Sequence, residues 1–225
     1  MPHAGPHMLD YDLAHVLGAG VLLFSFAQLY QRRVIAMANA YAAQSVLLAA
    51  AAFWQGWVQG ATELDVTGAL TLIAKGLLIP LALHWIVRRL DAQRSIDPVL
   101  GVFPTMAIGV AMVTLAILVI LPMTISAAAL AREDLALALS VVLLGLLAMI
   151  TRRTVLPQVV GFLSLENGLI LAAIGVVGMP LLVELSIAVL VLVATAVFGL
   201  LVRRMRERFA SLELHHLDRV GGAQR

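Results

Sequence analysis

The stretch from Arg152 to Val177 decides the fold, and it reads RRTVLPQVVGFLSLENGLILAAIGVV. Two arginines open it, and the apolar run that follows is long enough to cross a bilayer, which takes about 20 helical residues. Glu166 interrupts this run near its middle. A charged group at that depth costs about 2.5–3.5 kcal/mol on insertion scales, so it should face protein or a water path rather than lipid. The stretch therefore predicts a membrane helix that packs against protein around Glu166.

The composition of the whole chain is that of a membrane protein. Of its 225 residues, 62% are apolar and 12% are charged, and the mean hydropathy is +1.00. Soluble domains carry about 25% charged residues, so a soluble enzyme, a disordered chain and a nucleic-acid binder are excluded. The sequence has no cysteine, no glycine-rich phosphate loop, no Ser-His-Asp set and no cluster of metal ligands. We expect no catalytic residue, cofactor or metal in this chain.

Apolar segments of membrane-spanning length predict an all-α fold of about seven helices. The fifth is short and would depend on its flanks to span. No basic residue precedes the first segment, so we expect a retained helix there rather than a cleaved signal peptide. Residues 1–12 form an outer N-terminal segment, 13–202 the membrane domain and 203–225 a polar tail. The predicted helices are 13–31, 34–58, 66–87, 102–125, 135–151, 155–177 and 179–202.

The arginines predict the orientation. Fourteen of the fifteen basic residues are Arg, and thirteen of these fall on one side of the predicted bundle, with Arg132 alone on the other. Basic residues concentrate on the cytoplasmic side, so the N-terminus should be outside and the C-terminus cytoplasmic. This placement explains the pI of about 9.5 without nucleic acid. The preference for Arg over Lys suggests a GC-rich bacterial genome, and we expect an all-α, seven-helix protein of a bacterium in the inner (plasma) membrane. Arginine pairs end the first, third, fifth and seventh helices, at 32–33, 88–89, 152–153 and 203–204.

A weak internal repeat predicts two three-helix units. The arginine pair at 32–33 is followed by Gln44 and Ser45, and the pair at 152–153 by Glu166 and Asn167, in similar apolar surroundings. The units would cover 13–90 and 135–202 in the same orientation, because the single helix at 102–125 between them restores the direction of the chain.

Lys75, Glu166 and Glu184 are the ionisable residues predicted to lie within the membrane. Lys75 lies 13 residues before Arg88 and Glu166 lies 13 residues after Arg153, so both should sit about 20 Å from the arginine side. Glu184 should sit roughly 28 Å from that side, close to the outer surface. Lys75 and Glu166 are thus expected at the same depth.

The helix around Glu166 also carries a stripe of small residues. Such a stripe lets a neighbouring helix approach closely, and Glu166 points about half a turn away from it. The helix should therefore have partners on two sides, which requires either an additional chain or a central place in this one. The stripe consists of Gly161, Ser164, Gly168, Ala172 and Gly175.

Two interpretations of Glu166 and Lys75 remain open. In the first they are relay groups, because ionisable residues inside a membrane commonly mark proton or ion pathways. In the second they form a static ion pair that selects helix partners. Glu184, nearer to water, is a weaker relay candidate. Supporting polar residues would be Gln44, Asn167, Thr71 and His84, with a kink expected at Pro80.

The segment from Arg152 to Ala172 resembles the second helix of the K subunit of respiratory complex I. That family has an arginine pair, a glycine, a membrane glutamate and an asparagine at similar spacing, here Arg152-Arg153, Gly161, Glu166 and Asn167. Seven helices with this segment late in the chain are similar to the longer component E membrane subunit of hydrogenase-4 and formate hydrogenlyase-type complexes. Lys75 to Pro80 also resembles that subunit. One departure is clear, since Glu166 lies about one turn beyond the position that the complex I register would give.

The resemblance implies a non-catalytic membrane subunit of a complex I-like hydrogenase or oxidoreductase. It would lie between antiporter-like membrane subunits and a hydrogenase- or quinone-proximal arm, and would contribute to proton or cation translocation. Two alternatives stay open. One is a self-contained cation or small-solute transporter, and the other is a purely structural anchor or assembly subunit.

Overall fold

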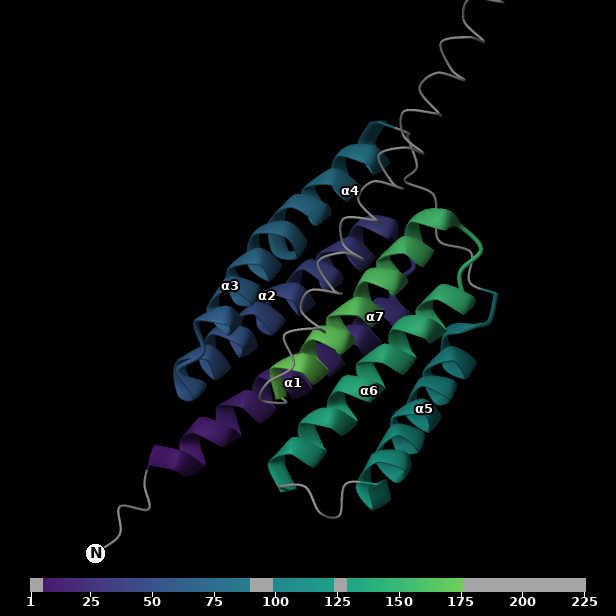
Figure 1. Ribbon diagram of the computed structural model, residues 1–225. Helices are drawn as coiled ribbons and strands as arrows, with labels where there is room; N and C mark the ends of the chain where they lie inside the picture. Colours follow the sequence, from purple (N-terminus) through teal and green to yellow (C-terminus); the bar gives the residue numbers. More distant parts are fainter. Residues whose placement is uncertain (1–5, 90–98, 124–128, 176–225) are drawn as a thin grey trace, which may run out of the picture. The chain divides into compact units, whose positions relative to one another are not determined.

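The computed structural model describes residues 6–89, 99–123 and 129–175, and all of them are part of one compact unit. The chain runs through α1 (Pro6–Tyr30), α2 (Val34–Gln59), α3 (Thr62–Leu70), η1 (Thr71–Leu78), α4 (Ile79–Arg89), α5 (Val102–Met123), α6 (Ala129–Ile150) and α7 (Val155–Gly175). These helices are drawn in Figure 1. Because lipid offers no hydrogen-bond partners, apolar segments of this length satisfy their backbone groups as helices.

Six helical segments of the described chain are long and apolar enough to cross a membrane. They match the first six predicted helices, with α3, η1 and α4 together making the third. The all-α, polytopic fold is confirmed. The seventh predicted helix, 179–202, and the tail, 203–225, lie outside the described residues, and the division into two three-helix units stays a prediction.

Two helices extend beyond their predicted ranges, although their apolar spans, Leu13–Tyr30 and Glu133–Ile150, agree with the prediction within two residues. The helix α6 begins at Ala129 and has 22 residues, so it starts before the predicted 135–151. Its first turns include Arg132, Glu133 and Asp134, which were taken for a connecting segment because they are charged. Charged residues are compatible with helix at the membrane surface, where water solvates them. The first helix likewise begins at Pro6, inside the segment 1–12 that was predicted to precede it.

The third span contains a π-helix. The eight residues from Thr71 to Leu78 form η1, which ends two residues before Pro80. A kink was predicted at Pro80, because its ring clashes with the carbonyl of residue 76 and it offers no N–H. The described structure has a π-helical stretch just before the proline. π-Helical turns are rare and often occur at functional sites, and Lys75 is buried in this one.

The helix α7 packs against α6 on one side and against α2 on another. A Cβ atom on Gly145 of α6 would lie 2.5 Å from the backbone nitrogen of Leu165, and one on Gly168 of α7 would lie 2.7 Å from the backbone nitrogen of Val142. Glycine is thus required at this contact, because nothing larger lets the two backbones approach so closely. Of the two expected arrangements, α7 therefore takes the central place within this chain.

The remaining helices complete the bundle around this contact. The helix α1 packs on α2 and α6, and α5 packs mainly on α6 (Figure 1). Large apolar side chains of α5 such as Phe103 and Leu118 are exposed, as expected of side chains that face lipid. The central core is made of Val21, Leu48, Ala52, Leu64, Ala138, Val141, Ile170, Leu171 and Ile174.

Gly60 makes the turn between α2 and α3. Its φ is 65° and its ψ is 26°, and its backbone N–H donates to the carbonyl of Gly56. Glycine adopts this left-handed conformation without the penalty that a Cβ brings. Glu63 and Asp65 follow in the first turn of α3, where negative charge is favourable to the helix dipole.

Candidate functional site

Lys75 and Glu166 meet inside the bundle. The Lys75 Nζ atom lies 3.0 Å from Oε1 of Glu166, and the two side chains are 2% and 1% exposed. Lys75 comes from η1 and Glu166 from α7, 91 positions apart in the chain. The equal depths expected from the arginine positions agree with this contact.

Asn167 and Gln44 extend the pair into a hydrogen-bonded network. Lys75 Nζ donates to Oδ1 of Asn167 at 3.1 Å. The Asn167 amide in turn donates to Oε1 of Gln44 at 3.2 Å and to Oγ of Ser45 at 3.1 Å. All of these side chains are buried. The residues at corresponding places in the predicted repeat, Gln44-Ser45 and Glu166-Asn167, are thus brought into one cluster by the packing of α2 on α7.

Gln44 is the centre of this network. Its Nε2 donates to Oγ of Ser25 at 2.7 Å and to Oγ of Ser164 at 3.0 Å. Its Oε1 also accepts from Nε2 of Gln28 at 2.8 Å. One amide therefore connects α1, α2 and α7 at the level of the ion pair.

The polar network continues along α1 to Arg152. The Nη2 atom of Arg152 donates to the carbonyl oxygens of Gln28 at 3.2 Å and Leu29 at 2.7 Å. Gln28 thereby contacts Gln44 through its side chain and Arg152 through its backbone. Arg152 is 3% exposed, and its burial lowers the pKa of its guanidinium from the ordinary value. Arginine stays protonated in proteins all the same, so it places a fixed positive charge at this end of the network.

Some polar atoms of this cluster are only partly satisfied. Apart from the contact with Lys75, neither carboxylate oxygen of Glu166 has a hydrogen-bond partner among the described residues, and neither does the buried hydroxyl of Tyr41. Buried polar groups nearly always have partners. Structural ion pairs in particular need additional hydrogen bonds to offset the loss of hydration. Among the described residues, the carboxylate of Glu166 lacks such additional hydrogen bonds.

The other predicted site residues have different outcomes. Thr71 is buried on η1, but none of the hydrogen bonds of the network in the described structure involves it. His84 lies apart from the network, and its Nδ1 contacts the carbonyl oxygen of Pro80 at 2.8 Å, one helical turn back. Glu184 lies outside the described residues.

Ser25, Gln28, Ser164, Tyr41 and Arg152 were not predicted as site residues. A weak signal was available on α1, where Ser25 and Gln28 follow Val21 at helical spacing and therefore share its face. Tyr41, Gln44 and Ser45 share a face of α2 for the same reason. Arg152 and Arg153 were used as a pair to predict the orientation of the helices in the membrane. No sequence pattern indicated that the side chain of Arg152 would be buried.

The arrangement places one cationic and one anionic side chain in contact with amides and hydroxyls. The amides of Gln44 and Asn167 hold donors and acceptors in place but do not ionise at physiological pH, so Lys75 and Glu166 are the groups of the network that can change charge. No group of three metal-ligating side chains occurs among the residues that the structure describes.

Comparison with known proteins places the chain beside hydrogenase-4 component E of Escherichia coli K12. The two are 29% identical over 184 residues, which cover 81% of this chain and 85% of that protein. The component E of Shigella flexneri shows the same values. The uncharacterized protein Rv0085 of Mycobacterium tuberculosis is 28% identical over 211 residues, covering 91% of this chain and 94% of its own length.

No family model matches the chain, and no solved structure matches it either. The likeness to component E extends well beyond the segment from Arg152 to Ala172 on which the sequence-based resemblance rested, since it covers most of both chains. Hydrogenase-4 component E is a homologue of this chain, and the resemblance expected from the sequence is confirmed.

Proposed function

We propose that the chain is a non-catalytic membrane subunit of a hydrogenase complex of the hydrogenase-4 type. Its homology to component E supports this proposal, as do the six helices of the described residues that are long and apolar enough to cross a membrane. Its partners are antiporter-like membrane subunits and a hydrogenase- or quinone-proximal arm. It lies in the bacterial inner membrane with its N-terminus outside and its C-terminus in the cytoplasm, as the arginine distribution favours.

Within that complex, Glu166 and Lys75 relay protons. The under-satisfied carboxylate of Glu166 carries this part of the proposal. It is 1% exposed and has the ammonium of Lys75 at 3.0 Å, and neither oxygen has a further partner among the described residues. A pair that served only to hold helices together would be expected to use more of its hydrogen-bonding capacity. Such an oxygen can take up a proton without first giving up a hydrogen bond.

Asn167 and Gln44 position the pair rather than carry protons. The Asn167 amide accepts from Lys75 and is itself held by Gln44 and Ser45. The ammonium of Lys75 contacts both the carboxylate of Glu166 and the amide oxygen of Asn167. It therefore keeps its hydrogen bond to Asn167 when Glu166 takes up a proton and loses its charge. Lys75 therefore keeps the same position in both protonation states of Glu166. A proton can then be transferred without a rearrangement of the side chains. Glu184 stays a further relay candidate nearer the outer surface.

The static pair and the independent transporter remain the competing functions. A transporter site usually lies on broken helices at the interface of repeats, and the π-helix around Lys75 is the one such irregularity within the described spans. The side chains of the polar cluster are nevertheless buried in the described structure. We therefore favour a subunit that acts with partners.

Purification of the full chain from its native membrane in a gentle detergent tests membership of the complex. Mass spectrometry of the purified sample is expected to find antiporter-like membrane proteins and a metal-containing soluble arm at fixed ratios to this chain. A chain that purifies alone or as a homo-oligomer, and moves cations when reconstituted alone in vesicles, contradicts the proposal and supports the transporter. Neutralising Lys75 and Glu166 together in the assembled complex tests the relay, as set out at the end of the Discussion.

A further inference from the structure

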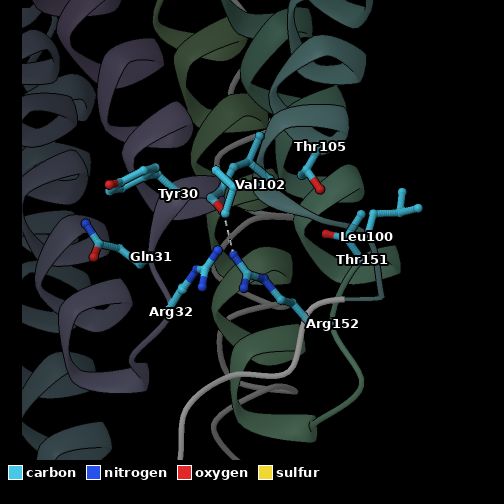
Figure 2. A pocket seen from close by; sticks show the side chains of 9 residues that line it. Tyr30, Gln31, Arg32, Leu100, Val102, Thr105, Thr151 and Arg152 are labelled. Atoms are coloured by element: carbon cyan, nitrogen blue, oxygen red, sulfur yellow. Dashed lines mark hydrogen bonds between the residues drawn. The ribbon is translucent and has the colours of Figure 1, made fainter.

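A pocket with two arginines lies at the end of the bundle where α1 ends and α5 begins. It is a small depression lined by the end of α1 and the residues after it, by the start of α5 and the residue Leu100 before it, and by the α6–α7 turn. The segment before α5 is held there because the backbone N–H of Val99 donates to the carbonyl of Thr151 at 2.9 Å. Figure 2 shows Arg32 and Arg152 with their guanidinium groups at this pocket.

Among the residues that the structure describes, the charge at this pocket is positive and only partly balanced. The Nη2 atom of Arg152 donates to the carbonyls of Gln28 and Leu29, whereas its buried Nε has no hydrogen-bond partner among the described residues. In residues 6–89, 99–123 and 129–175, no carboxylate lies within ion-pair distance of either arginine. Two like charges beside one pocket, one of them buried, are costly unless an anion joins them.

The start of α5 adds to the positive potential. Val102, the first residue of this 22-residue helix, lines the pocket, and the first turn carries no acidic side chain. The N-terminus of a helix carries about half a positive charge. In α5 only the N–H groups of Val102 and Phe103 are available there, because Pro104 has no N–H and the N–H of Thr105 donates to the carbonyl of Gly101. Two arginines and a helix N-terminus at one place match the usual chemistry of a phosphate site.

The position of the pocket indicates which phosphate would bind. It lies where membrane-spanning helices end, at the level of lipid headgroups, and the exposed aromatic residue Tyr30 lines it beside Arg32. Tyrosine is enriched at that level. The pocket is small, so a phosphate group would sit at its mouth, with the acyl chains extending along the exposed apolar face of α5.

We infer that this pocket binds the phosphate of an anionic phospholipid headgroup, held by Arg32, Arg152 and the N-terminus of α5. Basic pockets between transmembrane helices are a known way of holding anionic headgroups. The bound lipid would join α1, α5 and the α6–α7 turn. It would also complete the charge balance of Arg152, whose other contacts reach the polar network through Gln28.

Native mass spectrometry of the full chain tests this inference, with phosphatidylglycerol and phosphatidylcholine supplied in equal amounts. The wild-type chain is expected to retain one phosphatidylglycerol in preference to phosphatidylcholine. Arg32→Gln and Arg152→Gln should each weaken that binding by about tenfold, as expected for loss of a charge-assisted hydrogen bond. Arg32→Gln leaves the contacts of Arg152 with α1 in place, so it stays informative if Arg152→Gln does not fold.

The matched controls are Arg33→Gln and Arg153→Gln. Each removes the same charge one residue away, at an exposed position that does not line the pocket, and each should retain the lipid. Equal binding of the two lipids by the wild type, or an equal loss in the control variants, overturns the site. Millimolar inorganic phosphate that displaces phosphatidylglycerol and raises the unfolding temperature as much as the lipid does would overturn the lipid assignment in favour of a soluble phosphate.

Discussion

Replacing Lys75 by Met is expected to destabilise the folded chain by about 3–5 kcal/mol, because it leaves the carboxylate of Glu166 buried without a cation. The substitution also removes the donor to Asn167. Glu166→Gln should destabilise the folded chain less than Lys75→Met, since Lys75 keeps its hydrogen bond to the side-chain amide of Asn167. Thermal unfolding of the purified chain in detergent, followed by circular dichroism, measures both changes against the wild type.

The double variant Lys75→Met/Glu166→Gln is expected to recover most of this loss. Removing both charges of a buried pair is often neutral, or even stabilising, because neither has to be desolvated. The exposed pair of His15 and Glu133 provides the control. Its atoms are 3.7 Å apart and the side chains are 42% and 58% exposed, so Glu133→Gln should change stability by at most about 1 kcal/mol. A double variant as unstable as Lys75→Met would show that the two charges are not coupled in this way.

Gly145→Ala is expected to destabilise the contact of α6 with α7 by about 1–3 kcal/mol, the usual range for overpacking. The added Cβ would lie 2.5 Å from the backbone nitrogen of Leu165 and 2.7 Å from its Cα. Backbone atoms cannot move aside as a flexible side chain can, so α7 must shift as a whole. Since Glu166 is the next residue along α7, the shift should also disturb its contact with Lys75.

Gly76→Ala is the matched control for that prediction. Its Cβ would meet no atom closer than 3.5 Å, so only the ordinary helical preference for Ala over Gly should act, which is stabilising by roughly 0.5–1 kcal/mol. Unfolding temperatures of the two variants in the same detergent should therefore move in opposite directions. A loss at Gly76→Ala equal to that at Gly145→Ala would contradict the assignment of the tight contact to α6 and α7.

The membrane segments were predictable because bilayer thickness fixes the length of a spanning helix. The shared depth of Lys75 and Glu166 was predictable for a related reason, since a helix rises by a constant amount per residue from the arginines at its end. The start of α6 was missed because its charged residues Arg132 to Asp134 were read as a connecting segment. Counting residues along a helix therefore predicts the depth of a residue in the membrane well, but it predicts the ends of the helix poorly.

The network around Gln44 could not be predicted from depth alone. Which faces of α1, α2 and α7 meet depends on the rotation of each helix, and glycine contacts such as that of Gly145 with Leu165 determine this rotation. Arg152 shows the same limit, because its sequence context is that of any interfacial arginine, and only the fold brings it under the carbonyls of Gln28 and Leu29. The π-helix at Lys75 had only Pro80 as a local signal.

Proton translocation by the assembled complex carrying Lys75→Met/Glu166→Gln tests the relay most directly. The double variant avoids the unpaired buried charge that would complicate either single change. Inside-out vesicles allow electron transfer and proton uptake to be measured in one sample. We expect assembly and electron transfer to be retained, and protons moved per electron pair to fall by about tenfold or more, as for loss of a positioned proton-transfer group. Normal proton translocation in that variant would contradict the relay and leave Lys75 and Glu166 as a structural pair.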